Sequence, residues 1–220
     1  MILIPVKDLS AAKQRLARIL DQSARTELAQ TMLHDVVAAV SASPSCSQCS
    51  LVTSDRFAVE LARQYNFEVI LDPKNPGETG AIEMATQLCV ARGIESTLVI
   101  PADIPLIQSS ELDQILAQAP ALGTLLVPAA DGRGTNAAFR RPADLFPLRF
   151  GNDSFRPHLD AARATGKPCE VLQLPGIALD VDNPGDLQQL LERPGETRTQ
   201  GLLRQWTVDG RFLAMGKEGL

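Results

Sequence analysis

The segment from Val99 to Leu106 consists of an apolar run followed by a turn that carries one acidic residue, Asp103, which is a candidate for binding a ligand. The run ends at Ile100, and Pro101-Ala-Asp103-Ile-Pro105 follows. In an open α/β sheet, ligands bind at the carboxyl ends of the strands. A carboxylate there, on a backbone stiffened by two prolines, suits a magnesium ion that carries the phosphates of a nucleotide. The alternative is an aspartate that caps a helix or a turn.

Three cations lie close together in the loop after the first apolar run. Lys7, Lys13 and Arg15 fall within nine residues of one another. The whole chain has a formal net charge of −5, so a bound triphosphate would need such a local cluster. The loop has neither a G-x-G-x-x-G nor a P-loop pattern, so side chains would have to hold the phosphates. The alternative is a solvated helix face.

A loop rich in proline and glycine spans residues 73–80. Gly77 and Gly80 allow the backbone to approach a ligand closely. Glu78 could accept hydrogen bonds from both donors on the Watson–Crick edge of guanine, a pairing that adenine cannot offer. Backbone carbonyls could do the same, and the alternative for the whole loop is an ordinary surface turn.

Small polar residues recur in a later turn and at a helix start. The turn Asp131-Gly-Arg-Gly-Thr135-Asn136 ends in hydroxyl and amide side chains, and Gly151-Asn-Asp-Ser154 opens a helix. Helix N-termini favour anions. Thr135, Gly151 and Ser154 could therefore hold a small phosphorylated acid, whereas the alternative for Ser154 is a plain helix cap.

Two further acids, Asp180 and Asp182, end a late apolar stretch. Strand alternation would project both side chains to the same side. One of them could complete a metal site with Asp103. The alternative is a strand-end carboxylate that caps the following helix.

Composition places the chain among ordinary globular proteins. It has 220 residues, of which 45% are hydrophobic and 21% are charged. The net charge excludes a broad attraction to nucleic acid or to acidic membranes, and no apolar run nears the roughly 20 residues that span a bilayer. The start lacks the basic lead of a signal peptide, so we expect a cytoplasmic protein.

The cysteines and histidines form no recognisable metal motif. Cys46 and Cys49 make one C-x-x-C without a second pair at similar spacing, so we expect reduced thiols rather than zinc ligands. His34 and His158 fall within helical patterns, where we expect packing or surface roles.

Apolar runs alternate with helical patterns along most of the chain. Strands are expected at residues 2–6, 51–53, 67–71, 97–100, 125–128, 136–140, 170–174 and 178–182, and helices at 21–40, 57–65, 81–92, 109–117, 154–164 and from 184 onward. This alternation predicts a three-layer, Rossmann-like α/β fold, in which helices cover both faces of a mixed, mostly parallel sheet. Some antiparallel pairing is expected after Gly123.

The pattern fades after Arg193, which divides the chain into a domain at residues 1–193 and a C-terminal extension at residues 194–220. Within the extension, Leu202, Leu203 and Trp206 would form a small docking helix, for example on the partner subunit of a homodimer. The alternative is a mobile tail.

Taken in order, these segments resemble one enzyme family. The matching residues are Pro5–Lys7, Lys13-Gln-Arg15-Leu16, Thr53-Ser-Asp55, Pro101-Ala-Asp103-Ile-Pro105-Leu106, Asp131-Gly-Arg-Gly-Thr135-Asn136, Phe150-Gly151-Asn-Asp-Ser154-Phe155 with His158, and Leu179-Asp-Val-Asp182. They cover about residues 1–193 and resemble the 2-phospho-L-lactate and phosphoenolpyruvate guanylyltransferases of deazaflavin coenzyme (coenzyme F-420) biosynthesis.

The resemblance implies a nucleotidyltransferase fold and a reaction of GTP with a phosphorylated three-carbon acid that releases pyrophosphate. It implies Mg²⁺ as a cofactor, with Asp103 as a ligand; Asp182 is the expected second ligand. The acceptor could be phosphoenolpyruvate, 2-phospho-L-lactate or 3-phospho-D-glycerate. The alternatives are a nucleotidyltransferase for a sugar phosphate or a molybdopterin, and a non-catalytic GTP-binding regulator.

The expected site therefore has three groups of residues. Lys13, Arg15 and Asp103 are the expected catalytic residues; Pro5, Lys7, Lys13, Arg15, Glu78 and Gly80 are the expected nucleotide-binding residues; and Thr135, Gly151 and Ser154 are the expected acceptor-binding residues.

Overall fold

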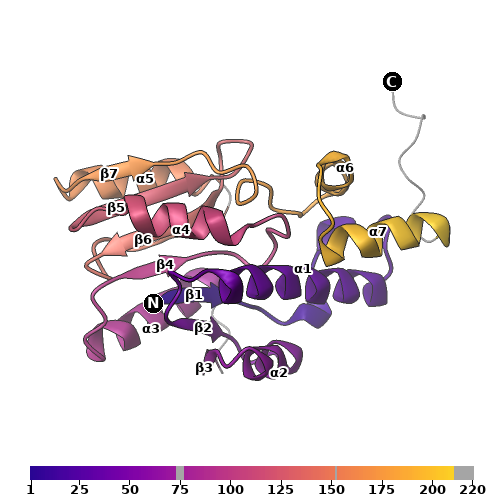
Figure 1. The fold of residues 1–220 in the computed structure, drawn as a ribbon, viewed down its shortest axis with the longest axis horizontal. Helices are drawn as coiled ribbons and strands as arrows, with labels where there is room; N and C mark the ends of the chain where they lie inside the picture. Colours follow the sequence, from indigo (N-terminus) through magenta and orange to yellow (C-terminus); the bar gives the residue numbers. More distant parts are fainter. Residues whose placement is uncertain (73–76, 152, 211–220) are drawn as a thin grey trace.

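The computed structural model describes residues 1–72, 77–151 and 153–210, and its strands form one mixed sheet (Figure 1). The order is β3-β2-β1-β4-β6-β5-β7, in which β6 runs antiparallel to both neighbours and the other pairs are parallel. The strands are β1 (Ile2–Pro5), β2 (Cys49–Val52), β3 (Glu68–Ile70), β4 (Thr97–Val99), β5 (Gly123–Pro128), β6 (Thr135–Arg141) and β7 (Cys169–Val171). The predicted α/β class and the antiparallel pairing after Gly123 are confirmed.

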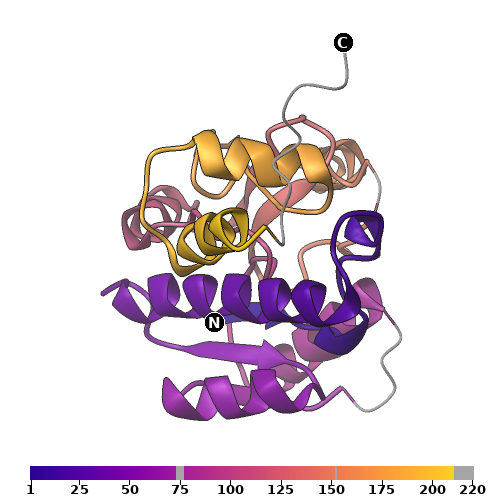
Figure 2. The same ribbon diagram turned by 90° about the vertical axis from the view of Figure 1, so that its right-hand side faces the viewer.

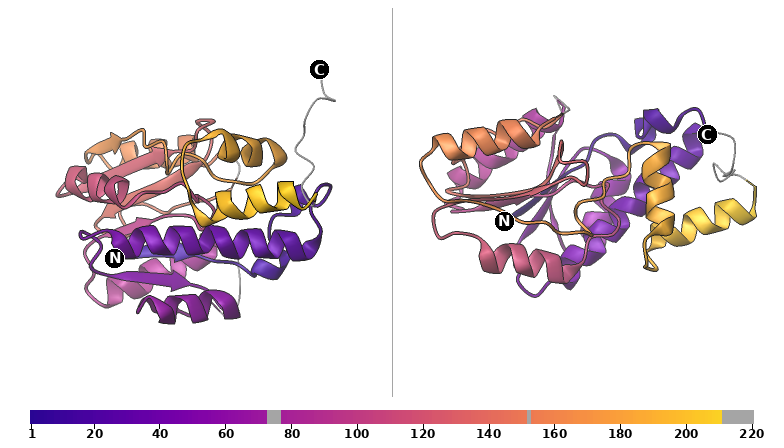
Figure 3. Two further views of the ribbon diagram at one scale, coloured as in Figure 1. Left: turned by 45° about the vertical axis from the view of Figure 1, so that its right-hand side comes forward. Right: turned by 90° about the horizontal axis from the view of Figure 1, so that it is seen from above.

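Helices cover both faces of the sheet, as expected (Figure 3). One face packs against α1 (Gln22–Ala42), α2 (Arg56–Gln64) and α4 (Ser109–Gln118), and the other against α3 (Glu78–Ala91) and α5 (Phe155–Ala164). Strand alternation produces the two layers. In β1, Ile2 and Ile4 join the first cluster, whereas Leu3 joins the second.

The strand order reverses at β1, which lies between β2 and β4. Leu3 of β1 is paired with Val99 of β4, so the loops that follow these two strands leave the sheet side by side. The first loop contains the short 3₁₀ helices η1 (Leu9–Ala11) and η2 (Gln14–Leu16), and the second carries Asp103. A reversal of this kind is where open α/β sheets bind ligands.

The last two helices, α6 (Pro184–Glu192) and α7 (Arg198–Val208), lie beyond the sheet, and α7 runs beside α1 (Figure 2). The Trp206 side chain is only 2% exposed and lies in an apolar cluster with Leu16 and Val181. The predicted docking helix therefore packs on its own chain, so Trp206 is not available to a partner subunit.

A carboxylate of α1 also fixes the start of α7. Asp35 accepts hydrogen bonds from the backbone N–H groups of Arg198 (3.0 Å) and Thr199 (2.9 Å), and from the Thr199 hydroxyl (2.6 Å). These bonds satisfy donors that a helix N-terminus leaves without partners.

The expected strand at residues 178–182 is wrong, because these residues are irregular. Their backbone groups do not pair with a strand of the sheet in a ladder. The side-chain amide of Asn136 donates to the carbonyls of Ile177 (2.9 Å) and Ala178 (3.1 Å), and Val181 N–H donates to the Asp103 carbonyl (3.0 Å). Strand alternation therefore does not apply to Asp180 and Asp182.

The four cysteines are free thiols. Among the described residues, no helix combines the length and the apolar character that crossing a bilayer requires.

Candidate active site

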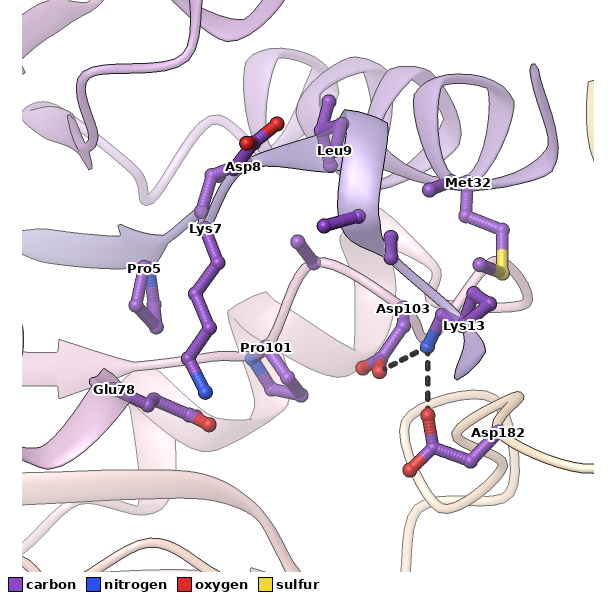
Figure 4. Close-up of a pocket in the computed structure, with 15 residues that line it drawn as sticks. Pro5, Lys7, Asp8, Leu9, Lys13, Met32, Glu78, Pro101, Asp103 and Asp182 are labelled. Carbon is purple, nitrogen blue, oxygen red and sulfur yellow. Dashed lines mark hydrogen bonds and ion pairs between the residues drawn. The ribbon is translucent and has the colours of Figure 1, made fainter. Parts of the chain in front are cut away.

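A cleft opens where the loops after β1 and β4 meet, and it consists of two adjoining cavities of about 470 Å³ and about 560 Å³. Both cavities are lined by Lys7, Glu78, Pro101, Asp103 and Asp182. Figure 4 shows the first cavity, and we call the part around Lys13, Asp103 and Asp182 the charged end. The second cavity continues to Thr135, Gly151 and Ser154, which we call the hydroxyl end.

At the charged end, the Lys13 ammonium lies between two carboxylates (Figure 4). Its Nζ is 2.6 Å from Asp103 Oδ2 and 2.9 Å from Asp182 Oδ1. The Lys13 side chain is only 8% exposed. Burial alone would lower the pKa of Lys13, but the charges and hydrogen bonds of Asp103 and Asp182 raise it above its ordinary value. Lys13 is therefore a permanent cation in this cleft.

The same ion pairs determine the state of Asp182. Burial alone would raise the pKa of this carboxyl, but Lys13, and then Arg15 and Lys7, hold it below the ordinary value. Asp182 is therefore ionised at neutral pH.

Local backbone geometry places Lys13, Asp103 and Asp182 at the charged end. Lys13 has a φ of 54°, a left-handed conformation that is uncommon for a non-glycine residue, and it links η1 to η2. Val181 N–H donates to the Asp103 carbonyl, which brings the chain before Asp182 beside the β4 loop. Asp186, in the first turn of α6, accepts from Asp182 N–H at 2.8 Å.

The two carboxylates that converge on Lys13 fit a magnesium site. Lys13 Nζ occupies the position between the carboxylates of Asp103 and Asp182. Their hard oxygen atoms are nevertheless of the type that binds Mg²⁺, which is commonly held by one or two carboxylates together with substrate phosphates. In the described part of the chain, no three or more His, Cys, Asp and Glu side chains gather as metal ligands. Asp180 is occupied differently, since its Oδ1 accepts from Asn136 at 3.0 Å.

The other predicted nucleotide-binding residues differ in whether they line the cleft and in how exposed they are. Pro5 and Lys7 line the first cavity, whereas the Arg15 side chain is 64% exposed and its Nη1 is 3.5 Å from Asp182 Oδ2. Gly80 lies within the first turns of α3 and is absent from the described residues that line the two cavities. Residues 73–76 of the predicted nucleotide loop lie outside the described residues.

Glu78 begins α3 and lines both cavities. Burial, followed by the negative charge of Asp103, raises the pKa of Glu78 to about 7. The Glu78 carboxyl therefore lies near the charged groups as well as near the predicted nucleotide loop, and its contact with guanine stays a prediction.

At the hydroxyl end, the predicted acceptor residues come together. Thr135 begins β6, and its N–H donates to Ser154 Oγ at 3.1 Å. Gly151, three residues before Ser154, lines the same cavity with a φ of 141°, which favours glycine. Arg133 is exposed and paired with Asp153.

Sequence reasoning named His158 among the matching residues but did not place it at this end. The expectation of a packing role is correct as to burial, since the residue is 1% exposed, but both ring nitrogens are hydrogen-bonded. The signal was the spacing, because Ser154 and His158 are four residues apart at the start of one helix and so lie on the same face.

The arrangement of strands and helices is that of the nucleotidyltransferases. A solved structure from Desulfovibrio desulfuricans G20, described as a nucleotide-diphospho-sugar transferase, matches 94% of this chain and 94% of its own with a TM-score of 0.76 at 18% identity. A cytidylyltransferase from Leptospira borgpetersenii matches 100% of this chain and 97% of its own with a TM-score of 0.57 at 13% identity. These identities establish the fold alone.

Sequence comparison identifies the family. The model of the family described as "Guanylyl transferase CofC like" matches residues 1–217. The chain belongs to this family of guanylyltransferases. It is 34% identical to the phosphoenolpyruvate guanylyltransferase of Sphaerobacter thermophilus over 85% of this chain and 90% of the relative. It is also 33% identical to the 3-phospho-D-glycerate guanylyltransferase of Colwellia psychrerythraea, over 86% and 90%.

Proposed function

We propose that this guanylyltransferase joins GMP from GTP to the phosphate of a three-carbon acid and releases pyrophosphate, a step of deazaflavin coenzyme biosynthesis. The observation that carries the proposal is one continuous cleft with a charged end and a hydroxyl end. Named relatives act on phosphoenolpyruvate and on 3-phospho-D-glycerate, so both are candidate acceptors together with 2-phospho-L-lactate.

The reaction needs no protein base. An oxygen of the acceptor phosphate attacks the α-phosphorus of GTP, and the bond from that phosphorus to the bridging oxygen breaks, so its electron pair leaves with pyrophosphate. The second pKa of a phosphate monoester is about 6, so the attacking oxygen is already mostly deprotonated at neutral pH. The obstacle is repulsion between two polyanions, which positioned cations reduce.

The residues of the charged end would neutralise and align the phosphates. Lys13 is a buried cation, and Lys7 and Arg15 add positive charge to the same cleft. Asp103 and Asp182 are the proposed ligands of Mg²⁺, which when bound would neutralise charge on the phosphates.

The two ends of the cleft support one orientation of the acceptor. Its phosphate must reach the charged end, where the α-phosphate of GTP is held. The carboxylate of the same small acid then falls toward Thr135, Gly151 and Ser154, whose hydroxyl and backbone groups suit an anion.

Mass spectrometry of the products tests the proposal. The protein is mixed with GTP, Mg²⁺ and each of the three acids in turn, with glucose 1-phosphate as an acceptor control and CTP as a nucleotide control. We expect a guanosine-diphospho adduct and pyrophosphate with at least one acid. Product with the sugar phosphate alone would indicate a different nucleotidyltransferase. GTP binding without pyrophosphate release from any mixture would indicate a regulator.

A further inference from the structure

The hydroxyl end depends on a side chain that does not itself line the cleft. His158 is 1% exposed on α5, and it is absent from the described residues that line the two cavities. Its Nε2 is 2.7 Å from Arg149 N, and its Nδ1 is 2.9 Å from Thr135 Oγ1. The imidazole thus connects the backbone that leads to Gly151 with the hydroxyl of Thr135.

These two contacts fix where the imidazole carries its proton. A backbone N–H can only donate, so Nε2 of His158 must accept from Arg149 and cannot be protonated. The neutral ring then has its hydrogen on Nδ1, which donates to Thr135 Oγ1. Burial, followed by the positive charge of Arg140, lowers the pKa of His158 to about 4, in agreement with a neutral ring at pH 7.

The fixed tautomer determines what the two hydroxyl groups can do. Thr135 Oγ1 already accepts from His158, and Ser154 Oγ already accepts from Thr135 N–H at 3.1 Å. Thr135 Oγ1 and Ser154 Oγ are 3.4 Å apart, so one of the two hydroxyl groups can donate its proton to the oxygen of the other. At least one O–H is then left to donate into the cleft that Thr135 and Ser154 line.

The loop that carries Gly151 is fixed by the same group of contacts. Arg149 N–H is held by His158, and the next amide, Phe150 N–H, donates to Thr79 Oγ1 at 3.0 Å. The ring of Phe150 also meets the imidazole edge-on, at 5.2 Å between centroids. The imidazole therefore contacts both sides of the hydroxyl end.

We propose that His158 is a positioning residue for the acceptor: by donating from Nδ1 to Thr135, it commits the hydroxyl end to donate hydrogen bonds to an anionic group of the substrate. This role rests on the proposed guanylyl transfer. The ligand group that fits the hydroxyl end is a carboxylate, because the cations of the charged end would hold the phosphates and the uncharged donors of Thr135 and Ser154 would then be left for the carboxylate.

Two near-isosteric variants separate the two functions of the ring. His158→Asn keeps an amide N–H near the position of Nδ1, whereas His158→Gln keeps an oxygen near the position of Nε2 and loses the donor to Thr135. We expect His158→Gln to raise the KM for the acceptor about 10-fold, the scale of one hydrogen bond to a charged group. His158→Asn should stay within about 3-fold of the wild type, and the KM for GTP should not change in either variant.

A double-mutant cycle tests whether His158 acts through Thr135. Thr135→Val keeps the shape and removes the hydroxyl, so it should raise the acceptor KM by itself. In that background His158→Gln should add less than about 2-fold. Full additivity would overturn the proposal, as would equal effects of the Asn and Gln variants or a parallel rise in both KM values.

The activity of the wild-type protein distinguishes failure of the proposed role of His158 from failure of the proposed guanylyl transfer. A wild-type protein that transfers GMP to no acid overturns the proposed function, and the role of His158 with it. Transfer by the wild type with no selective effect of His158→Gln overturns only the role. If His158→Gln does not fold, as judged by thermal unfolding, Thr135→Val decides alone, because an unchanged acceptor KM in that variant contradicts the proposal.

Discussion

The two ends of the cleft differ in the charge of the groups that form them. The charged end pairs a lysine with two carboxylates, whereas the hydroxyl end uses an imidazole, hydroxyls and backbone N–H groups that stay neutral at pH 7. In the proposed reaction, charge is redistributed on the phosphates during transfer, while the carboxylate of the acceptor keeps its charge. Preorganised charges would therefore stabilise the transition state at one end, and neutral donors would supply uniform binding at the other. Changes at the charged end should lower kcat, and changes at the hydroxyl end should raise the acceptor KM.

The largest effect is expected from removing the support behind the charged end. Trp206 of α7 packs with Leu16 and Val181, which lie close in sequence to Lys13 and Asp182. Trp206→Ala should reduce the free energy of unfolding by about 3–5 kcal/mol, the range for truncating a buried aromatic residue. Urea unfolding measures this loss.

The same variant tests whether the C-terminal helix supports the charged end specifically. Protein that remains folded at low temperature should lose kcat more than acceptor affinity. Val208→Ala on the same helix is the control, because Val208 is 86% exposed and should change neither quantity. A normal kcat in folded Trp206→Ala would separate α7 from the active site.

Next in size is the loss of one carboxylate at the charged end. Asp103→Asn should keep the fold and reduce kcat about 100-fold or more, the scale for one electrostatic element of catalysis. Pyrophosphate release at saturating GTP, Mg²⁺ and acceptor measures this. Asp160→Asn on α5 is the matched control, since the Asp160 side chain is exposed and lines neither cavity, and it should leave kcat unchanged. Near-normal turnover by Asp103→Asn would remove Asp103 from the mechanism.

His158, which supports the hydroxyl end, should affect how the free energy of unfolding depends on pH. The pKa of His158 is lowered to about 4, below the ordinary value of about 6.5. The folded state thus resists protonation, so the contribution of His158 is fully present above pH 6.5 and is lost as the pH falls toward 4. Between pH 7 and pH 4.5, the wild type should lose about 2 kcal/mol more than His158→Asn.

Urea unfolding at the two pH values measures that difference. His34→Asn serves as the control, because it removes the other histidine of the chain and should leave the pH dependence in place. Equal losses in the wild type and in His158→Asn would show that the imidazole is not held neutral.

Sequence patterns predicted the fold well because its determinants are local. Buried strands are apolar runs, and the reversal of strand order at β1 brings the ends of two such runs together. The position of Asp103 at that edge follows from the strand that precedes it. The same reasoning was wrong for residues 178–182, whose alternating pattern resembles a strand. The Asn136 side chain and the Asp103 carbonyl, which bond to the backbone of this stretch, are distant in sequence and could not be inferred from it.

The remaining parts of the site depend on tertiary contacts. The left-handed φ of Lys13 is not encoded by a glycine or an asparagine, so no local signal marks it. The role of His158 requires the loop at Arg149 to fold back over α5, which spacing alone does not specify. Types of residue and their order therefore predicted most of the proposed site residues that line the cleft, while the pairing among them came from the structure.

The smallest effect is expected from a single hydroxyl. Ser154→Ala should raise the acceptor KM about 5- to 10-fold, because it removes one donor to the substrate anion and the partner of Thr135 N–H. The kcat and the KM for GTP should change less than about 2-fold, since neither depends on a contact that forms only in the transition state. Steady-state kinetics with each substrate varied in turn gives all three values, and Ser110→Ala on the exposed side of α4 is the control. A fall in kcat without a change in acceptor KM would mean that the Ser154 hydroxyl contributes to the transition state rather than to acceptor binding. The division of catalysis and acceptor binding between the two ends would then be wrong.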